Sequence, residues 1–288
     1  MIKISLFIIS LTPRSFFILL VDIYMYSRIY KLFASYKITK VNLKIAYPNL
    51  NNSNIELISK LSIRESLISG YETIYSWARP TNDSNSFIFR VENNFLLKNY
   101  ARQQMGLITV AIHNRSADML LAWICSQTPT VSLYKKIKNR SLDSFVKNKR
   151  ESGGSVCVET SISGVRKIYK ALKQNKVICF AADQVPQRGM GEYIKFFNRD
   201  SYSTTLVQSL ALKTKSPLVF LYINSNKDKY LTITIESINN NIYKDSKHSQ
   251  IINNGIEKII NKRPIDYSWE YKRFKKNKPG QQDPYSGI

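Results

Sequence analysis

His113 and Asp118 are the two side chains whose types and spacing best suit catalysis in this sequence. His113 directly follows the apolar run 107–112, and ligands of open α/β sheets bind beyond the carboxyl ends of the strands. Asn114 or Ser116 can cap a following helix, which would place Asp118 in its first turn. An aspartate there can orient the imidazole, which then takes a proton from an acceptor hydroxyl. Taken alone, this short and common pattern fits better a histidine that only caps or packs, with an acid that favours a helix N-terminus.

The elements that must position this pair alternate along the chain. Continuous apolar, β-branched runs predict strands that are buried on both faces. The predicted strands are 86–91, 107–112, 130–133, 177–182, 218–223 and 230–235. Apolar spacing and capping residues, such as the capping box at Ser53–Glu56, predict the helices 53–77, 93–104, 117–126, 141–149, 163–174, 204–214 and 246–261. The alternation predicts an α/β fold with a mostly parallel central sheet flanked by helices.

The N-terminal segment is apolar but interrupted. Pro13 and Arg14 divide it into two short runs, whereas a spanning helix needs about 20 apolar residues. An interfacial or re-entrant anchor, a kinked spanning helix and a buried helix all fit, and basic residues after it suit an anionic leaflet. We expect residues 1–50 to form an N-terminal membrane-associated helical segment and residues 51–288 to form one α/β catalytic domain.

The charge balance points to an anionic partner. The 288 residues include 43 Lys and Arg against 20 Asp and Glu, a formal net charge of +23. Nucleic acid, an acidic protein and an anionic lipid surface all fit this charge. No zinc-finger or RNP-like motif is present, so nucleic acid is not expected. The three cysteines lie in or beside apolar runs without metal-ligand spacing, which predicts buried reduced thiols and no metal site.

Several short motifs accompany the His113 motif in a fixed order along the chain. They are the segments 42–48, 135–143, 150–154, 171–175, 182–189, 196–199, 203–205 and 267–275. In this order they resemble the motifs of the late, lauroyl/myristoyl-type lipid A biosynthesis acyltransferases, within the lysophospholipid/glycerolipid acyltransferase superfamily. Any one motif is weak, but the ordered set covers nearly the whole chain and is specific.

The resemblance implies transfer of a fatty acyl chain from acyl-acyl-carrier protein to a hydroxyl of a lipid A precursor. It implies a location at the cytoplasmic face of the bacterial inner membrane and no cofactor beyond the acyl-carrier co-substrate. The partners would be acyl-carrier protein, an anionic lipid or glycolipid acceptor and the membrane, which together would account for the positive charge. The absence of a Gly-x-Ser-x-Gly motif agrees with direct attack on the thioester.

The resemblance also implies roles for individual residues. His113 would be the general base and Asp118 would orient it. Arg150 would bind a phosphate or stabilise the developing oxyanion. Asp183 and Gln184 follow another predicted strand and therefore belong to the same edge of the sheet. The candidate substrate-binding residues are Arg115, Arg150, Gly153, Gly154, Asp183, Gln184, Arg188, Phe196 and Phe197, the two phenylalanines as walls of an acyl channel or as core.

The sequence departs from the family pattern beside the base. The family's first motif reads close to His-x-Gly-Asn-Trp-Glu, whereas here Asn114 follows the histidine directly and Asp118 replaces the glutamate. Asn198 replaces a glycine after Phe-Phe. A lysophospholipid or another glycolipid as acceptor, or a non-catalytic homologue, therefore stay open as alternatives, and acyl chain length is not determined.

Overall fold

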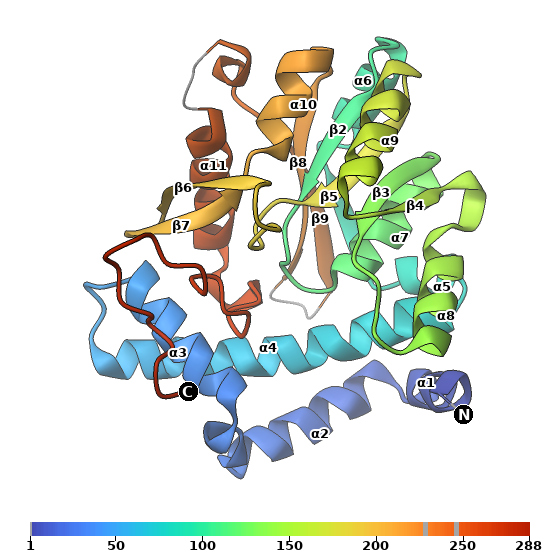
Figure 1. Cartoon of the computed structure of the whole chain (residues 1–288). Coiled ribbons are helices and arrows are strands. Elements are labelled where there is room, and N and C mark those ends of the chain that lie inside the picture. Colours follow the sequence, from blue (N-terminus) through green and yellow to red (C-terminus); the bar gives the residue numbers. More distant parts are fainter. Residues whose placement is uncertain (1, 227–229, 245–247) are drawn as a thin grey trace.

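The computed structural model describes residues 2–226, 230–244 and 248–288, and within them seven strands form one sheet. These strands are β1 (Ile88–Glu92), β2 (Leu107–Ala111), β3 (Thr130–Tyr134), β4 (Val156–Glu159), β5 (Val177–Ala181), β8 (Leu218–Ser225) and β9 (Leu231–Ser237). Their order is β1-β9-β8-β2-β5-β3-β4, and only the β8–β9 pair is antiparallel. The mostly parallel sheet is thus confirmed (Figure 1).

Helices cover both faces of this sheet. They are α6 (Phe95–Arg102) and α7 (Ala117–Gln127) on one face, and α9 (Ile162–Lys173), α10 (Leu206–Thr214) and α11 (His248–Lys262) on the other. Side chains alternate along β2 because successive residues of a strand point to opposite faces. Ile108 and Val110 pack in the layer with α9, α10 and α11, whereas Leu107 and Ala111 pack in the layer with α7. The predicted α/β fold class is confirmed.

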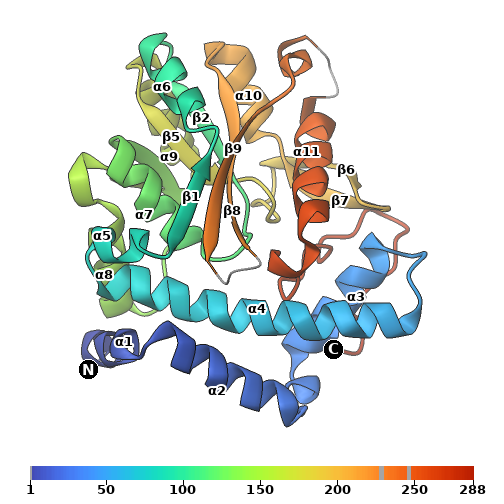
Figure 2. The same ribbon diagram turned by 180° about the vertical axis from the view of Figure 1, so that it is seen from behind.

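A long helix, α4 (Asn52–Ala78), runs across the carboxyl edge of the sheet (Figures 1 and 2). The sequence predicts Ser53 as its cap, but Asn51 caps it instead, because its side chain accepts a hydrogen bond from the Asn54 N–H at 2.8 Å. The helix α3 (Ala34–Ala46) contributes Leu43 to the main core. The capping box was therefore misplaced by two residues, while the helix itself is confirmed.

The first two helices, α1 (Ile2–Leu11) and α2 (Arg14–Tyr26), lie on the side of α4 that faces away from the sheet (Figure 2). Among the described residues, no single helix is long and apolar enough to cross a membrane. Taken together α1 and α2 would suffice, but the chain bends by 97° between them. Their exposed large apolar side chains are Ile2, Ile4, Phe7, Ile8, Ile9, Leu11, Phe16, Leu19, Leu20, Ile23 and Tyr26.

Some elements were not predicted from the sequence. The strand β4 has only four residues with exposed ends, and the antiparallel hairpin β6 (Gly191–Phe196) and β7 (Arg199–Thr204) is largely polar, so neither shows a long apolar run. The helix predicted from residue 204 starts at Leu206 because β7 extends to Thr204. The predicted start of the last helix at Ser246 lies outside the described residues.

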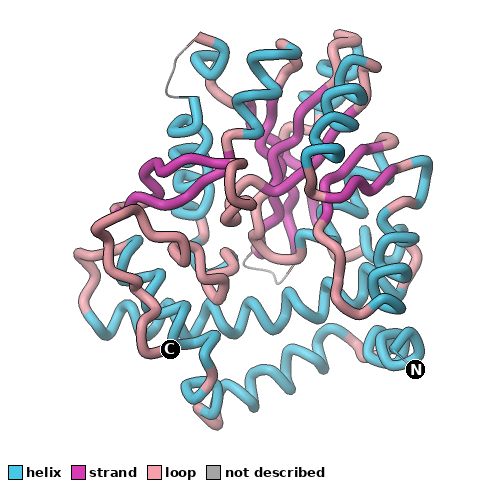
Figure 3. Tube along the Cα trace, in the orientation of Figure 1, coloured by secondary structure: helices cyan, strands magenta, loops and turns pink. Residues whose placement is uncertain are grey.

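The remaining short helices are α5 (Thr81–Asn85), α8 (Arg140–Arg150), η1 (Ile29–Leu32), η2 (Ser152–Gly154), η3 (Asn240–Tyr243) and η4 (Pro264–Asp266). After η4 the chain is mostly loop and lies beside α3 (Figure 3). Asn42 of α3 holds this loop, because its side-chain amide donates to the Trp269 carbonyl at 2.7 Å. The three cysteines are free and buried, as predicted.

Candidate functional site

The carboxyl ends of two neighbouring strands bring His113 and Asp183 together. Nδ1 of His113 lies 2.8 Å from Oδ1 of Asp183, and the His113 backbone N–H donates to Oδ2 at 3.1 Å. β2 and β5 are parallel with Ala111 opposite Ala181, so the residues two positions beyond each strand meet. The sequence analysis assigned the orienting role to Asp118. The structure corrects this contact, because Asp183 occupies the place beside Nδ1.

Asp118 forms a different pair. Its Oδ1 accepts a hydrogen bond from Nε of Arg150 at 2.7 Å. Ser116 caps α7 by accepting from the Met119 N–H at 3.1 Å, which places Asp118 in the first turn of that helix, as predicted. From there the carboxylate reaches the end of α8 and does not fold back onto the imidazole. The site therefore contains two ionic pairs, His113–Asp183 and Asp118–Arg150.

The surroundings of His113 determine which of its ring nitrogens can accept a proton. Burial opposes a charge on the imidazole, but the adjacent Asp183 carboxylate outweighs it and raises the pKa of His113. Burial also disfavours the charged Asp183 carboxylate, yet His113 holds its pKa below the usual range. With Nδ1 donating to the carboxylate, Nε2 of the neutral ring is an acceptor. The side-chain amide nitrogen of Gln184 lies 3.3 Å from Nε2 and suits that role as donor.

Two adjoining cavities open beside this pair. The larger, about 430 Å³, is lined by His113, Arg150 and Gln184 and by the cations Lys135 and Lys275. The smaller, about 170 Å³, also reaches His113 and Arg150. Its apolar wall comes from Ala111, Ala117, Leu120, Leu121, Leu133, Cys179, Phe180 and Ala181. The histidine thus stands between a polar opening and an apolar recess. Within the part of the chain that the structure describes, no three His, Cys, Asp or Glu side chains are grouped to hold a metal ion.

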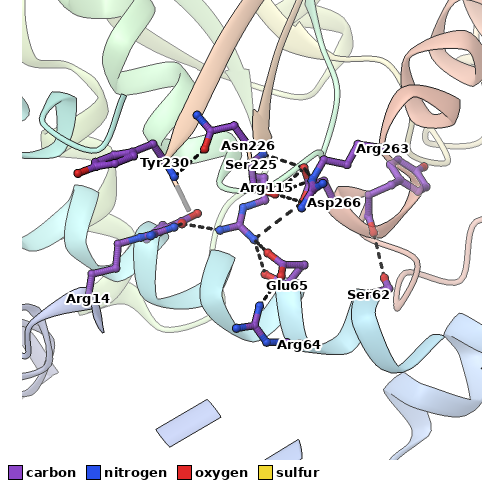
Figure 4. Close-up of polar contacts among 12 residues, drawn as sticks. Arg14, Ser62, Arg64, Glu65, Arg115, Ser225, Asn226, Tyr230, Arg263 and Asp266 are labelled. Atoms are coloured by element: carbon purple, nitrogen blue, oxygen red, sulfur yellow. Dashed lines mark hydrogen bonds and ion pairs between the residues drawn. The ribbon is translucent and has the colours of Figure 1, made fainter. Parts of the chain in front are cut away.

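Arg115 is not part of these cavities. Its side chain is 1% exposed and forms an ion pair with Glu65 of α4 (Figure 4). It forms a second ion pair with Glu72 of the same helix. The left-handed backbone of Arg115, at φ 52°, turns its side chain toward α4, opposite to the direction expected for a substrate ligand. The predicted substrate-binding role of Arg115 is thus corrected to a buried structural contact.

The two phenylalanines also lie elsewhere. Phe196 is fully buried in the main core and packs against the Arg273 guanidinium at 4.6 Å from the ring centroid. Phe197 packs against Tyr47 and Trp269, with ring centroids 5.6 and 5.7 Å apart. Neither ring lines the cavities beside His113. The structure favours the core alternative over the acyl-channel alternative.

The remaining candidates differ in position. Gln184 lines the larger cavity, as expected. Arg188 is exposed and does not line it. Gly153 and Gly154 precede β4 and so lie at the amino end of that strand, away from His113. Their positive φ angles, 65° and 80°, indicate a turn that glycine suits. We therefore assign both glycines to chain geometry and not to substrate contact.

Tyr271 and Lys275 belong to the motif 267–275, but they were not predicted to be cavity residues. Tyr271 and Lys275 line the larger cavity, and the Tyr271 hydroxyl accepts a hydrogen bond from the Val185 N–H at 3.1 Å. This contact ties the C-terminal loop to the segment that follows Asp183. A basic and aromatic motif signals such residues, but only the folded chain shows which of them face the cavity.

Fold and site together define a class of protein: an α/β enzyme with a histidine–carboxylate pair at the carboxyl edge of a mostly parallel sheet, beside an apolar cavity. Residues 1–276 match the family described as bacterial lipid A biosynthesis acyltransferase. The chain belongs to this family and is an acyltransferase. The resemblance inferred from the ordered motifs is confirmed.

Curated relatives are similar over most of their length. A lipid A biosynthesis palmitoleoyltransferase of Escherichia coli (strain K12) and a lipid A biosynthesis acyltransferase of Shigella flexneri are each 23% identical over 254 residues. Each alignment covers 86% of this chain and 81% of the relative. Among solved structures, the 1-acyl-sn-glycerophosphate acyltransferase PlsC from Thermotoga maritima aligns with a TM-score of 0.39 and 12% identity, covering 88% of this chain and 96% of that chain.

Proposed function

We propose that this acyltransferase moves a fatty acyl chain from acyl-acyl-carrier protein to a hydroxyl of a lipid A precursor at the cytoplasmic face of the inner membrane, with His113 as general base. The observation that carries the proposal is the His113–Asp183 pair, because its histidine lines both the polar and the apolar cavity. A histidine held in this way has one nitrogen for the carboxylate and one for the reacting hydroxyl.

The reaction then follows from these groups. The acceptor hydroxyl takes the place of the Gln184 amide beside Nε2 of His113. Nε2 then takes the proton of this hydroxyl while the hydroxyl oxygen attacks the thioester carbonyl carbon. Asp183 stabilises the imidazolium that forms and keeps the ring oriented. As the tetrahedral intermediate collapses, the carbon–sulfur bond breaks and the imidazolium returns the proton to the leaving thiolate. The products are the acylated lipid and free acyl-carrier protein, without a covalent enzyme intermediate.

Arg150 supports the intermediate in this proposal. Its guanidinium lines both cavities and is held by Asp118, and that carboxylate outweighs the effect of burial so that the pKa of Arg150 is raised. A fixed cation beside the reacting carbonyl stabilises a developing oxyanion. Asp118 then acts as the residue that positions Arg150.

The two cavities differ in polarity, which suggests that they bind different parts of the substrates. The apolar wall that includes Leu120, Leu121 and Cys179 suits the first part of an acyl chain. The larger cavity, with Lys135 and Lys275, suits anionic groups of the acceptor or of the acyl-carrier protein. The exposed apolar side chains of α1 and α2 support docking on a membrane that supplies the lipid acceptor.

The test is transfer by purified protein from acyl-acyl-carrier protein to a lipid A precursor, followed by mass spectrometry of the lipid product. His113→Ala should lower the rate by about 1000-fold, within the range general bases contribute, with an unchanged circular dichroism spectrum. His248→Ala, which removes the other histidine, is the matched control and should retain activity. Turnover retained by His113→Ala would contradict the proposed base. Acylation of a lysophospholipid but not of the lipid A precursor would contradict the acceptor.

A further inference from the structure

The loop that carries His113 is held on its other side by a buried ionic cluster. Arg115 lies two residues after the histidine, and its guanidinium contacts Glu65 on α4 (Figure 4). It also contacts Glu72 on the same helix. Nη2 of Arg115 donates to Oε1 of Glu72 at 2.6 Å, and Nη1 also donates to the Glu65 backbone carbonyl at 3.2 Å. Asp266 of η4 adds a third carboxylate 3.9 Å from Nη1. These contacts link three elements far apart in sequence.

The backbone of this loop is strained, and hydrogen bonds from neighbouring segments hold it in place. Arg115 adopts a left-handed conformation, with φ 52°, which is unfavourable for a residue other than glycine. The Arg115 N–H donates to the Asp266 carbonyl at 2.8 Å, and the His113 carbonyl accepts from the Ser268 N–H at 3.0 Å. Such a conformation persists only where its surroundings hold it. The side-chain contacts of Arg115 therefore help to hold the backbone from which His113 projects.

One carboxylate connects the ionic cluster around Arg115 to the N-terminal helices. Oε1 of Glu72 accepts from Arg115 at 2.6 Å and from Nη2 of Arg14 at 2.7 Å. The Glu72 side chain is completely buried, whereas that of Arg14 is 16% exposed. Arg14 is the first residue of α2, which packs on the outer side of α4. Two ionic contacts therefore connect α2 to Arg115: Arg14 contacts Glu72, and Glu72 contacts Arg115.

We infer that Arg14 is a positioning residue: through Glu72 and Arg115 it holds the loop that carries His113 in its productive conformation. The inference rests on the proposed function, because it assigns His113 as the base. It gives a reason for the position of Arg14, whose side chain is only 16% exposed and contacts the same carboxylate as Arg115. It also makes the N-terminal helices part of the support of the active site as well as a surface for the membrane.

The charges of the cluster support this coupling. Burial opposes the charge on Arg115, but Glu72, Asp266 and Glu65 outweigh it and raise its pKa. Burial raises the pKa of Asp266 to about 6, although Arg115 and Arg263 oppose the rise. Loss of Arg14 would leave Glu72 with Arg115 as its partner in the cluster and free its carboxylate to turn. A small displacement of the loop would follow, and even a misplacement of about 1 Å can cost 100-fold in rate.

The experiment compares two variants that each remove an ion pair between the N-terminal region and α4. Arg14→Gln removes the contact with Glu72. Lys31→Gln removes the partly exposed contact of η1 with Glu56, nine residues before Glu65 on α4. Acyl transfer is assayed in detergent micelles with acyl-acyl-carrier protein and lipid A precursor, and kcat and KM are determined separately. Hydrogen exchange of the Arg115 amide is measured on the same samples.

We expect Arg14→Gln to lower kcat about tenfold, with both KM values unchanged and faster exchange of the Arg115 amide. Arg14→Lys should recover part of kcat, and Lys31→Gln should stay within twofold of the wild type. Should Arg14→Gln not yield folded protein, Arg14→Met takes its place, because its long apolar side chain can cover the Phe87 ring over which the Arg14 guanidinium lies.

Equal kcat values and equal amide exchange in the Arg14→Gln and Lys31→Gln variants would overturn the inference. The failure of the proposed function would look different, because His113→Ala would then retain turnover. An inactive His113→Ala variant together with an unaffected Arg14→Gln variant would reject only the positioning role of Arg14.

Discussion

The two sides of the loop after β2 differ in exposure and in the way their charges are paired. His113 faces the cavities with a 28% exposed side chain and has one carboxylate partner, Asp183. Arg115 faces α4 with a 1% exposed side chain and has carboxylates around it from Glu65, Glu72 and Asp266. Both are ionisable residues of one short motif. A group with a nitrogen that faces a cavity can act on a substrate, whereas a cation enclosed by buried carboxylates holds the fold.

A second comparison concerns the two aspartates near His113. Asp183 hydrogen bonds to the imidazole and to the backbone of His113, whereas Asp118 hydrogen bonds to Arg150. Asp118 is closer in sequence and Asp183 is 70 residues away. Proximity along the chain therefore misleads here, because neighbouring parallel strands bring distant residues to one edge.

Arg115→Ala should destabilise the protein by about 3–5 kcal/mol, because it removes the buried cation that Glu65, Glu72 and Asp266 share. Urea unfolding followed by circular dichroism measures this change. Lys136→Ala is the matched control, since it removes an exposed ion pair with Glu159 and should leave the unfolding midpoint unchanged. Equal stability of the Arg115→Ala variant and the wild type would show that the cluster does not hold the loop.

Asp183→Asn should lower kcat/KM about 100-fold, because the imidazole loses the carboxylate that orients it and stabilises its charge. The same change removes the main cause of the raised pKa of His113. Since the base acts in its neutral form, the acidic limb of the pH–rate profile should move to lower pH. Asp200→Asn, at an exposed ion pair with Lys195, controls for the loss of a carboxylate. An unchanged acidic limb would argue against His113 as the titrating group.

Asp118→Asn should lower kcat/KM only about tenfold, as expected for loss of one hydrogen bond to a charged group. Because its partner is Arg150, the acidic limb of the pH–rate profile should stay close to that of the wild type. Measured beside Asp183→Asn, this variant distinguishes the two aspartates. A larger loss with a displaced limb would restore the pairing of Asp118 with His113 that the sequence motif predicted.

Much of the fold could be predicted because it depends on local pattern. The apolar run that forms β2 is buried at all five positions, and the helix α7 begins at Ala117 as its cap predicted. The polar hairpin β6–β7 and the short strand β4 could not be predicted, because their stability comes from neighbours and not from their own apolar side chains.

The site was predicted in part for a similar reason. Both His113 and Asp183 were expected at the carboxyl edge, because each follows a strongly apolar strand. Their pairing depends on β5 being the neighbour of β2 in the sheet, with β3 one position further out. Strand order depends on crossover connections and on packing. The residues at the ends of the strands carry no pattern that reveals this order.

The sequence by itself determined the α/β class, the cationic charge, the family resemblance and the histidine that the site is built around. The tertiary structure decided which carboxylate contacts that histidine, which arginine reaches the cavities and which is buried, and that the two phenylalanines belong to the core. Residue type and local periodicity act within a few residues of chain, so the sequence reports them directly. Burial and charge pairing depend on which distant segments meet, and they are settled only when the sheet, α4 and the C-terminal loop pack together.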